Sequence, residues 1–337
     1  MPVPEHIEIK QLDLELNGGC NYACPMCPQA EGREKEFLKK LPFKVFTKIV
    51  DDAAQYGLDT VSLHGSGEPT LNKDFPDYVR YVREKDLRCI SFTNGFRLTE
   101  DMSRRLIEAR INVLRISCNG YDRESYAHWM SQDAYQRVRD NVKRFVELNR
   151  ELGGESEVHM YHLITDLAQK DYEIQQYKQN WVDYTGAFSE IWLMHNWAGQ
   201  NGVEIGYSRD IMIKDPGAKR SCGRPFSPLL QLRAGGLEGH SAAVVACCMV
   251  LGKDSQGVLG HLDNASIADV VGGAAYNELR AAHREGRFDD IPYCKGCDQL
   301  YDVPESLVWT NIPGRQYGQS KVVADVDHRK FAEIAAE

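Results

Sequence analysis

The sequence predicts an α/β protein in which six parallel strands alternate with helices and a smaller, cysteine-rich module follows. Short β-rich runs alternate with helical runs through the first two thirds of the chain. Helices between successive strands require parallel pairing with right-handed crossovers. Beyond about residue 200, Gly, Pro and Cys punctuate short segments instead. Periodicity leaves open whether the sheet is doubly wound and open or a partly closed barrel.

Six segments are predicted as strands and five as helices, in alternation. The first strand, Leu12 to Leu16, alternates apolar and acidic residues, as strands do. The first helix, Lys44 to Tyr56, carries its apolar residues on one face, and Gly57 ends it. The later strands are predicted at residues 60–64, 88–92, 112–117, 158–164 and 191–194, and the later helices at 75–85, 99–109, 134–152 and 172–184. In either architecture, ligands bind at the carboxyl ends of the strands.

Composition excludes several classes of protein. A chain of 337 residues that is 42% hydrophobic and 26% charged has the material for a packed core, and its length suits one main domain with a smaller one. The formal net charge of −9 argues against a nucleic-acid partner bound through a basic face. The longest mainly apolar run, residues 242–251, is about half of a bilayer span. With no secretion signal at the start, we expect a cytoplasmic protein without a membrane partner.

Ten cysteines in such a chain point to metal binding or catalysis, because a reducing compartment disfavours disulfides. Cys20, Cys24 and Cys27 follow the first strand with the spacing C-x3-C-x2-C. A closed zinc site needs four ligands, whereas three thiolates suit a [4Fe–4S] cluster with one open iron. A non-enzymatic zinc-binding scaffold remains the alternative from another class.

With this loop the sequence resembles the radical S-adenosylmethionine (AdoMet) superfamily, although Met26 stands where that family has an aromatic residue. His64-Gly-Ser-Gly-Glu-Pro69 is similar to the family's glycine-glycine-glutamate motif. Thr93-Asn94-Gly95 and Ser117-Cys118-Asn119-Gly120 are similar to its AdoMet-contacting strand ends. The resemblance implies a partial (β/α)6 TIM-like barrel over residues 10–205. It also implies a [4Fe–4S] cluster on the three cysteines, with AdoMet bound to its open iron.

The resemblance also assigns residues to AdoMet. Glycines at 65 and 67 have no Cβ and allow the backbone to approach a ligand closely. A carboxylate at Glu68 offers an acceptor for the methionyl ammonium, and serine and asparagine side chains can hydrogen-bond the ribose or the carboxylate. The predicted AdoMet-binding residues are Gly65, Gly67, Glu68, Thr93, Asn94, Ser117 and Asn119.

The late cysteines resemble the auxiliary-cluster modules called Twitch and SPASM, although a zinc ribbon also fits their spacing. The resemblance implies one auxiliary [4Fe–4S] cluster within residues 206–305, followed by a tail over 306–337. Its predicted ligands are Cys222, Cys247, Cys294 and Cys297. Spacing cannot separate Cys247 from Cys248, and the thiol left over could donate a hydrogen atom to a substrate radical. Cys118 is a second candidate for that role.

Family membership would imply reductive cleavage of AdoMet to a 5′-deoxyadenosyl radical, with electrons from a reductant such as flavodoxin or ferredoxin. Only about ten residues precede the first strand, so we expect a small polar substrate rather than a leader peptide. The hypothesis is oxidation or epimerisation of a sugar, aminocyclitol or nucleotide-sugar in secondary metabolite or glycan biosynthesis. Arg115 and His195, near strand ends, are candidates to assist proton transfer. A peptide or protein maturase of the sulfatase-activating kind is the alternative within the enzyme class.

Overall fold

The structure is a computed structural model of the chain, and it describes residues 7–200, 212–301, 306–315 and 331. Ten strands of these residues form one sheet in the order β10-β6-β5-β4-β3-β2-β1-β7-β8-β9. The sheet is open rather than closed, so the predicted α/β class and the partial barrel are confirmed. The strands are β1 (Gln11–Leu14), β2 (Thr60–Leu63), β3 (Arg88–Thr93), β4 (Val113–Ser117), β5 (Glu157–Ile164), β6 (Phe188–Leu193), β7 (Leu229–Ala234), β8 (Ala242–Val245), β9 (Val258–His261) and β10 (Leu307–Thr310).

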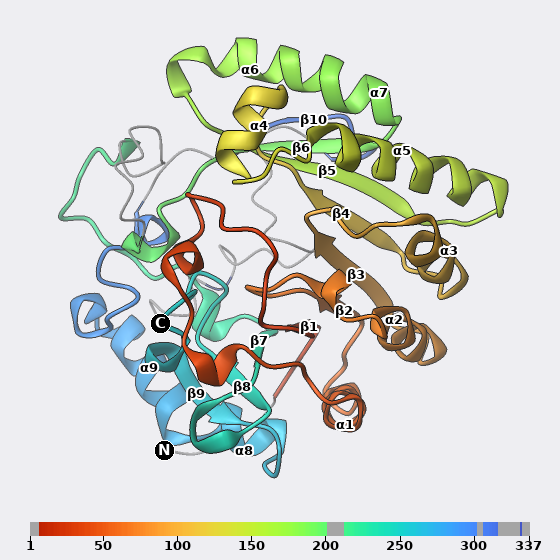
Figure 1. The fold of residues 1–337 in the computed structure, drawn as a ribbon. Coiled ribbons are helices and arrows are strands. Elements are labelled where there is room, and N and C mark those ends of the chain that lie inside the picture. The colour runs from red at the N-terminus through yellow and green to blue at the C-terminus, as the bar shows by residue number, and fades with distance from the viewer. Residues whose placement is uncertain (1–6, 201–211, 302–305, 316–330, 332–337) are drawn as a thin grey trace.

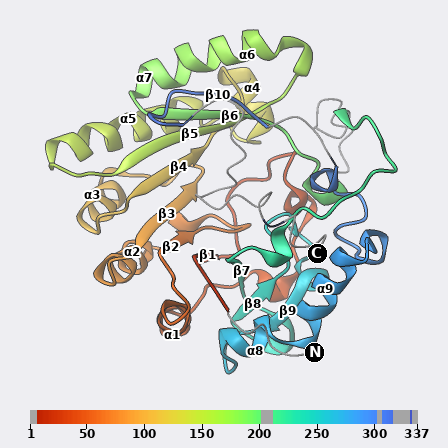
Figure 2. The same ribbon diagram turned by 180° about the vertical axis from the view of Figure 1, so that it is seen from behind.

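Helices cover one side of the curved sheet. Figures 1 and 2 show α1, α2, α3 and α5 along the outside of strands β1 to β6, while α8 and α9 lie beside β8 and β9. No helix of the described residues is long and apolar enough to cross a membrane. The helices are α1 (Phe43–Ala54), α2 (Phe75–Glu84), α3 (Glu100–Glu108), α4 (Arg123–Trp129), α5 (Tyr135–Glu151), α6 (Lys170–Tyr177), α7 (Asp183–Thr185), α8 (Ile267–Val271) and α9 (Ala274–Arg284).

Strands β1 to β6 pair in parallel and in chain order, as the sequence pattern predicts. The sheet also extends past both predicted edges. Strand β7 pairs in parallel with β1, and β8 and β9 follow it antiparallel. Strand β10 pairs antiparallel with β6, so the segment predicted as a tail begins with a strand. The predicted domain boundary at residues 205/206 lies outside the described residues, and the domain limits stay a prediction.

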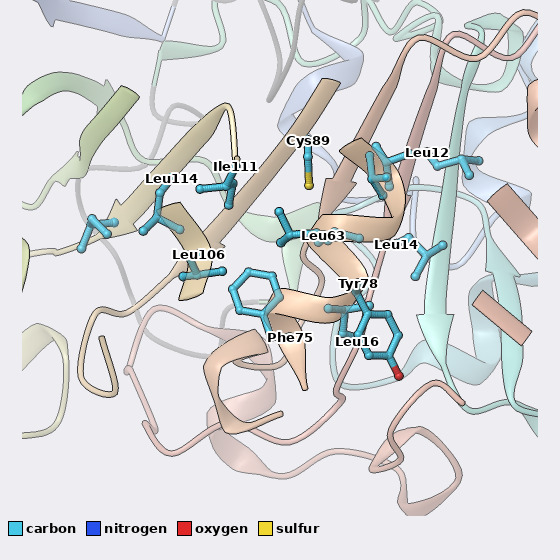
Figure 3. Close-up of a cluster of buried hydrophobic side chains, with 14 of the residues drawn as sticks. Leu12, Leu14, Leu16, Leu63, Phe75, Tyr78, Cys89, Leu106, Ile111 and Leu114 are labelled. Atoms are coloured by element: carbon cyan, nitrogen blue, oxygen red, sulfur yellow. The ribbon is translucent and has the colours of Figure 1, made fainter. Parts of the chain in front are cut away.

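The alternation in β1 separates an apolar face from an acidic one. Leu12, Leu14 and Leu16 belong to the cluster of buried side chains between sheet and helices, together with Phe75 (Figure 3). Because successive side chains point to opposite faces, the acidic residues of this segment lie on the other face of the sheet. Both Asp13 and Glu15 are buried there, at 0% and 1% exposure. Acidic residues that stay this buried need partners, and those partners build the site.

Candidate active site

The first cysteine loop follows β1 at its carboxyl end. Cys20, Cys24 and Cys27 are free thiols and line one cavity of about 190 Å³, the first cavity. The Tyr22 backbone N–H donates to Cys20 Sγ at 3.4 Å. Burial raises the pKa of Cys27 to about 11, so a metal centre bound here has to displace protons from the thiols.

The donor set fits an iron–sulfur cluster better than a single zinc ion. Within the described part of the chain, no three His, Cys, Asp or Glu side chains converge as the ligands of one metal ion do. Ligands of a cubane bind different irons and therefore stand further apart. Three soft thiolates around one cavity thus suit a [4Fe–4S] cluster whose fourth iron is open to another ligand.

The glycines after β2 make room for the chain itself. A Cβ on Gly67 would lie 1.8 Å from the Asn17 carbonyl oxygen, and one on Gly65 would lie 2.4 Å from Glu15 Oε2. From the sequence we expected a ligand to lie close to the backbone of these glycines. In the structure, the chain segment that follows β1 lies there instead. Both glycines also line the first cavity. Their small size therefore fixes how closely the cysteine loop lies against the glycine loop.

Glu68 holds the ends of β2 and β3 together. Its Oε1 accepts hydrogen bonds from the Thr70 N–H at 2.9 Å and from the hydroxyls of Thr70 and Thr93, both at 2.6 Å. Its Oε2 accepts from the Asn94 N–H at 2.7 Å. A carboxylate offers about four acceptor positions, so roughly one position, on Oε2, stays open. The predicted contact with an ammonium group is confined to that position.

The remaining predicted AdoMet residues also lie at the first cavity. Thr93, Asn94, Ser117 and Asn119 all line it. Asn119 Oδ1 accepts from the Leu163 N–H at 2.9 Å, which ties the end of β4 to β5. The Asn94 side-chain amide donates to Asn21 Oδ1 at 2.9 Å, which ties the end of β3 to the cysteine loop. Both amides thus position the cavity wall, and their roles toward AdoMet stay predictions.

A second cavity of about 230 Å³ adjoins the first. Arg115, His195 and Cys248, all predicted as catalytic, line it. Six residues line both cavities, so the two are contiguous: His64, Gly65, Phe92, Ser117, Tyr161 and Trp197. Gln231 and Arg233 of β7 line the second cavity as well, and the sequence analysis missed them. The signal was available, since they are the two polar residues in the otherwise apolar run Leu-Leu-Gln-Leu-Arg-Ala.

Cys118 does not reach these cavities. Its side chain is completely buried in the apolar cluster and lines neither cavity. Its neighbours Ser117 and Asn119 both line the first cavity, and alternation turns the residue between them to the other side. This placement does not support Cys118 as a hydrogen-atom donor, and that role stays a prediction.

The late cysteines separate into two groups. Cys222, Cys247, Cys294 and Cys297 line a third cavity, whereas Cys248 lines the second. Three residues line both the second and the third: Arg224, Met249 and Gln299. The three cavities are therefore arranged in series, with Cys248 at the second. The assignment of the four thiols as ligands of an auxiliary cluster stays a prediction that this grouping supports.

Sequence comparisons identify the family. A family model described as the radical SAM superfamily matches residues 14–166, and one described as the SPASM iron–sulfur cluster-binding domain matches residues 240–298. This chain belongs to the radical SAM superfamily. It is a radical SAM enzyme whose cofactors are AdoMet and a [4Fe–4S] cluster, with auxiliary iron–sulfur binding in the SPASM region. The alternative of a non-enzymatic zinc scaffold is set aside.

Curated proteins match this chain over part of its length. Fe-coproporphyrin III synthase of Methanosarcina barkeri is 34% identical over 101 residues, 30% of this chain and 25% of that protein. A probable GTP 3′,8-cyclase of Methanococcus maripaludis (strain C7) is 26% identical over 141 residues, 42% of this chain and 47% of that protein. The matches thus span at most about half of these relatives.

Two solved structures share the fold. BtrN in complex with AdoMet and 2-DOIA has a TM-score of 0.57 at 18% identity, covering 87% of this chain and 94% of BtrN. Streptococcus suis SuiB bound to the precursor peptide SuiA has a TM-score of 0.60 at 14% identity, covering 81% of this chain and 67% of SuiB. Since one of these structures holds a small molecule and the other a peptide, the fold alone does not assign a substrate.

A buried charge network ties the cysteine loop of this radical SAM enzyme to β7. Arg33 lies between two carboxylates, with Nη2 2.9 Å from Glu15 Oε1 and Nε 3.0 Å from Asp254 Oδ2. Arg233 Nε lies 3.0 Å from the other oxygen of Asp254. All four side chains are at most 2% exposed. Burial acts to lower the pKa of Arg33, but its two carboxylate neighbours outweigh burial and raise it, so the pairs stay ionised.

Removing Asp254 should be strongly destabilising. In Asp254→Ala two buried guanidiniums lose a shared partner, and breaking a buried ion pair costs about 3–5 kcal/mol. Urea unfolding of the metal-free protein measures the loss. Asp133→Ala is the matched control, because its pair with Arg123 is exposed and should contribute little. Equal losses in the two variants would contradict the importance of the buried network.

A methyl group at Gly67 should weaken AdoMet binding. The Asn17 carbonyl oxygen that its Cβ meets at 1.8 Å is main chain, so the whole loop has to shift. We expect Gly67→Ala to raise the AdoMet Kd at least about tenfold, or about 1.4 kcal/mol, in anaerobic calorimetry. Gly19→Ala is the control, since its Cβ meets no atom closer than 3.8 Å. AdoMet binding of wild-type strength in Gly67→Ala would show that the loop tolerates the change.

Proposed function

We propose that this radical SAM enzyme inverts a carbon centre of a small polar substrate, a sugar or nucleotide-sugar, with Cys248 as the hydrogen-atom donor. The observation that carries the proposal is the division of the late cysteines. Four of them line the third cavity, and Cys248 lines the second together with Arg115 and His195. A thiol that lies beside a substrate cavity can donate a hydrogen atom to a substrate radical there.

The order of the cavities supports inversion rather than simple oxidation. When AdoMet and the reduced cluster are bound, they supply a 5′-deoxyadenosyl radical that removes a hydrogen atom from carbon. Ser117 and Tyr161 line both the first and the second cavity and mark the side on which AdoMet would be bound. Cys248 adjoins residues that line both the second and the third cavity. Its thiol therefore lies toward the end of the second cavity that is opposite the AdoMet side. A hydrogen removed on one side and returned on the other inverts the carbon.

The atoms and electrons of this exchange balance. The Cys248 S–H bond breaks and a C–H bond forms, which leaves a sulfur radical on the protein. One electron and one proton restore the thiol, and the electron comes from a one-electron reductant such as flavodoxin or ferredoxin. Arg224 Nη1 lies 3.0 Å from Cys248 Sγ and holds the sulfur in place through this cycle.

The size of the second cavity supports a small substrate over a peptide. Its volume of about 230 Å³ lies below the roughly 300–1,000 Å³ of ordinary ligand pockets. Tyr161 and Trp192 line its wall, stacked with ring centroids 6.0 Å apart, and flat aromatic surfaces suit the carbon face of a sugar ring. In an oxidation, by contrast, Cys248 would be dispensable, and Arg115 or His195 would assist loss of the hydroxyl proton.

Replacing Cys248 tests the proposal. Turnover of nucleotide-sugars and sugar acids in deuterated water should add one deuterium at the inverted carbon. Cys248→Ala should still form 5′-deoxyadenosine but lose the deuterated epimer at least about 100-fold, or about 2.7 kcal/mol of barrier. Mass spectrometry and NMR of the product measure both.

Cys118→Ala is the matched control, a buried cysteine outside the cavities that should keep epimerisation. The contrary result is a product two mass units lighter than the substrate, formed in equal amounts by wild type and Cys248→Ala. That result would show that the reaction is an oxidation and would contradict epimerisation.

A further inference from the structure

We propose that a lysine-rich face beside the first cysteine loop is the docking surface for an acidic one-electron carrier protein. We define this basic face by five lysines of one segment and the two exposed apolar side chains among them: Lys35, Lys39, Lys40, Lys44, Lys48, Leu38 and Phe43. A radical SAM enzyme needs a reductant whatever its substrate, so the inference does not depend on the proposed epimerisation. It goes beyond the proposed function because it assigns residues of the surface to that partner.

The segment that carries the basic face lies directly against the cysteine loop. It leads from that loop into α1 (Figure 1). The Lys39 carbonyl oxygen accepts a hydrogen bond from the Gly18 N–H at 2.8 Å, and Lys40 forms an antiparallel bridge with Asn17. Cys20 follows Gly18 by two positions. A carrier docked on this face would therefore lie close to the first cysteine loop, and electron transfer through protein requires a short distance.

The charge of this segment opposes that of the chain as a whole. Residues 35–48 hold five lysines and one carboxylate, Glu36, in a protein with a formal net charge of −9. The side chains of Lys35, Lys40 and Lys44 are exposed and form no ion pair with any residue that the structure describes. The segment therefore presents a local excess of positive charge to solvent.

Neighbouring polar groups leave this charge uncompensated. Lys48 Nζ donates to the Asp263 main-chain carbonyl oxygen at 2.8 Å, and Lys39 Nζ donates to that of His240 at 3.5 Å. Because carbonyl oxygens are neutral, neither contact cancels a lysine charge. The carboxylates of Asp263 and Glu34, beside the face, each accept a hydrogen bond from a main-chain N–H at 2.8 Å instead. The positive field of the face therefore attracts a partner of opposite charge.

Apolar side chains are exposed within the same face. Five large hydrophobic side chains are exposed among the described residues, and Leu38 at 51% and Phe43 at 43% are two of them. A third, Leu237, lies next to the face, because the Gly236 N–H donates to the Glu36 carbonyl oxygen at 3.3 Å. Protein interfaces combine a buried apolar centre with a polar rim. Exposed apolar side chains among unpaired lysines suit an electron-transfer interface, which belongs to the small size class.

The charge of the face determines the class of partner. An acidic carrier is attracted from a distance, and complementary charge mainly raises the rate of association. One electron then passes to the first cluster, so the carrier is oxidised by one electron and the cluster is reduced by one. No atom or proton crosses the interface. The face therefore fits a flavodoxin or ferredoxin of net negative charge, whereas it repels a basic carrier.

Binding of oxidised carriers to the anaerobically reconstituted holoenzyme tests the proposal without turnover. Calorimetry compares an acidic flavodoxin with an acidic ferredoxin. We expect at least one of them to bind at about 25 mM salt. Its Kd should rise at least about tenfold at about 300 mM salt, because salt screens attraction between exposed charges.

Charge reversal identifies the surface. The double variant Lys40→Glu/Lys44→Glu should weaken binding of that carrier at least about tenfold at low salt, since it replaces attraction by repulsion. Lys143→Glu/Lys178→Glu is the matched control. It changes the net charge equally at two exposed lysines, one on α5 and one directly after α6, and should change the Kd by less than about threefold.

An apolar variant tests the interface separately from its charge. Leu38→Ser should weaken binding at least about threefold and leave the salt dependence unchanged, since it removes apolar contact area and no charge. Leu152→Ser, at a side chain of similar exposure at the end of α5, is its control and should bind as wild type does. Iron content and reduction by dithionite, a small reductant that needs no docking surface, are measured in each variant.

Three results would overturn the proposal: no binding of either acidic carrier, an affinity that salt leaves unchanged, or equal losses in the double lysine variant and its control. If Lys40→Glu/Lys44→Glu loses iron, Leu38→Ser decides, and binding of wild-type strength in that variant then contradicts the proposal. Carrier binding is measured without a product, so its failure is distinct from that of the proposed epimerisation, which is read from deuterium in the product.

Discussion

The buried network of Glu15, Arg33, Asp254 and Arg233 is the constraint on which the site depends. Four charges removed from water carry a large desolvation cost, and only close pairing with opposite charges offsets it. Two carboxylates and two guanidiniums do so at 2.9–3.0 Å with almost no exposure. Glu15 also accepts hydrogen bonds from the N–H groups of Gly67 and Ala234. The network therefore fixes the cysteine loop, the glycine loop and β7 in one arrangement.

That arrangement explains why the cavities lie in series. Asp254 follows Cys247 and Cys248 in the chain, and Arg33 follows Cys27, so their ion pair joins the two cysteine-bearing segments. The parallel pairing of β7 with β1 places Arg233 beside the same carboxylate. A substrate in the second cavity would thus lie between the first cysteine loop and the segment that carries Cys247 and Cys248. Buried charges, rather than exposed loops, set the distance between these two segments. Rigid spacing of this kind is what radical chemistry requires of a protein, because the cofactor supplies the reactive group.

Much of the barrel could be predicted from periodicity, because helices and parallel strands alternate with few interruptions. The six predicted strands agree with β1 to β6 within a few residues, and the cysteine loop carried the family resemblance. Strand β7 was missed because it comes far along the chain, and nothing in its own sequence says that it pairs with β1. The buried charge network was missed for the same reason, since Arg33 and Asp254, which pair in it, are 221 positions apart. Spacing could not separate the adjacent Cys247 and Cys248, and only the structure shows that they line different cavities.

The central claim is that the three cysteines after β1 hold a cluster with an iron open to AdoMet, beside a cavity for the substrate. Electron paramagnetic resonance of the dithionite-reduced enzyme under anaerobic conditions, with and without AdoMet, tests it most directly. We expect iron–sulfur signals of which one changes when AdoMet is added, accompanied by 5′-deoxyadenosine. Signals that AdoMet leaves unchanged, or a reduced enzyme with no iron–sulfur signal, would contradict the claim.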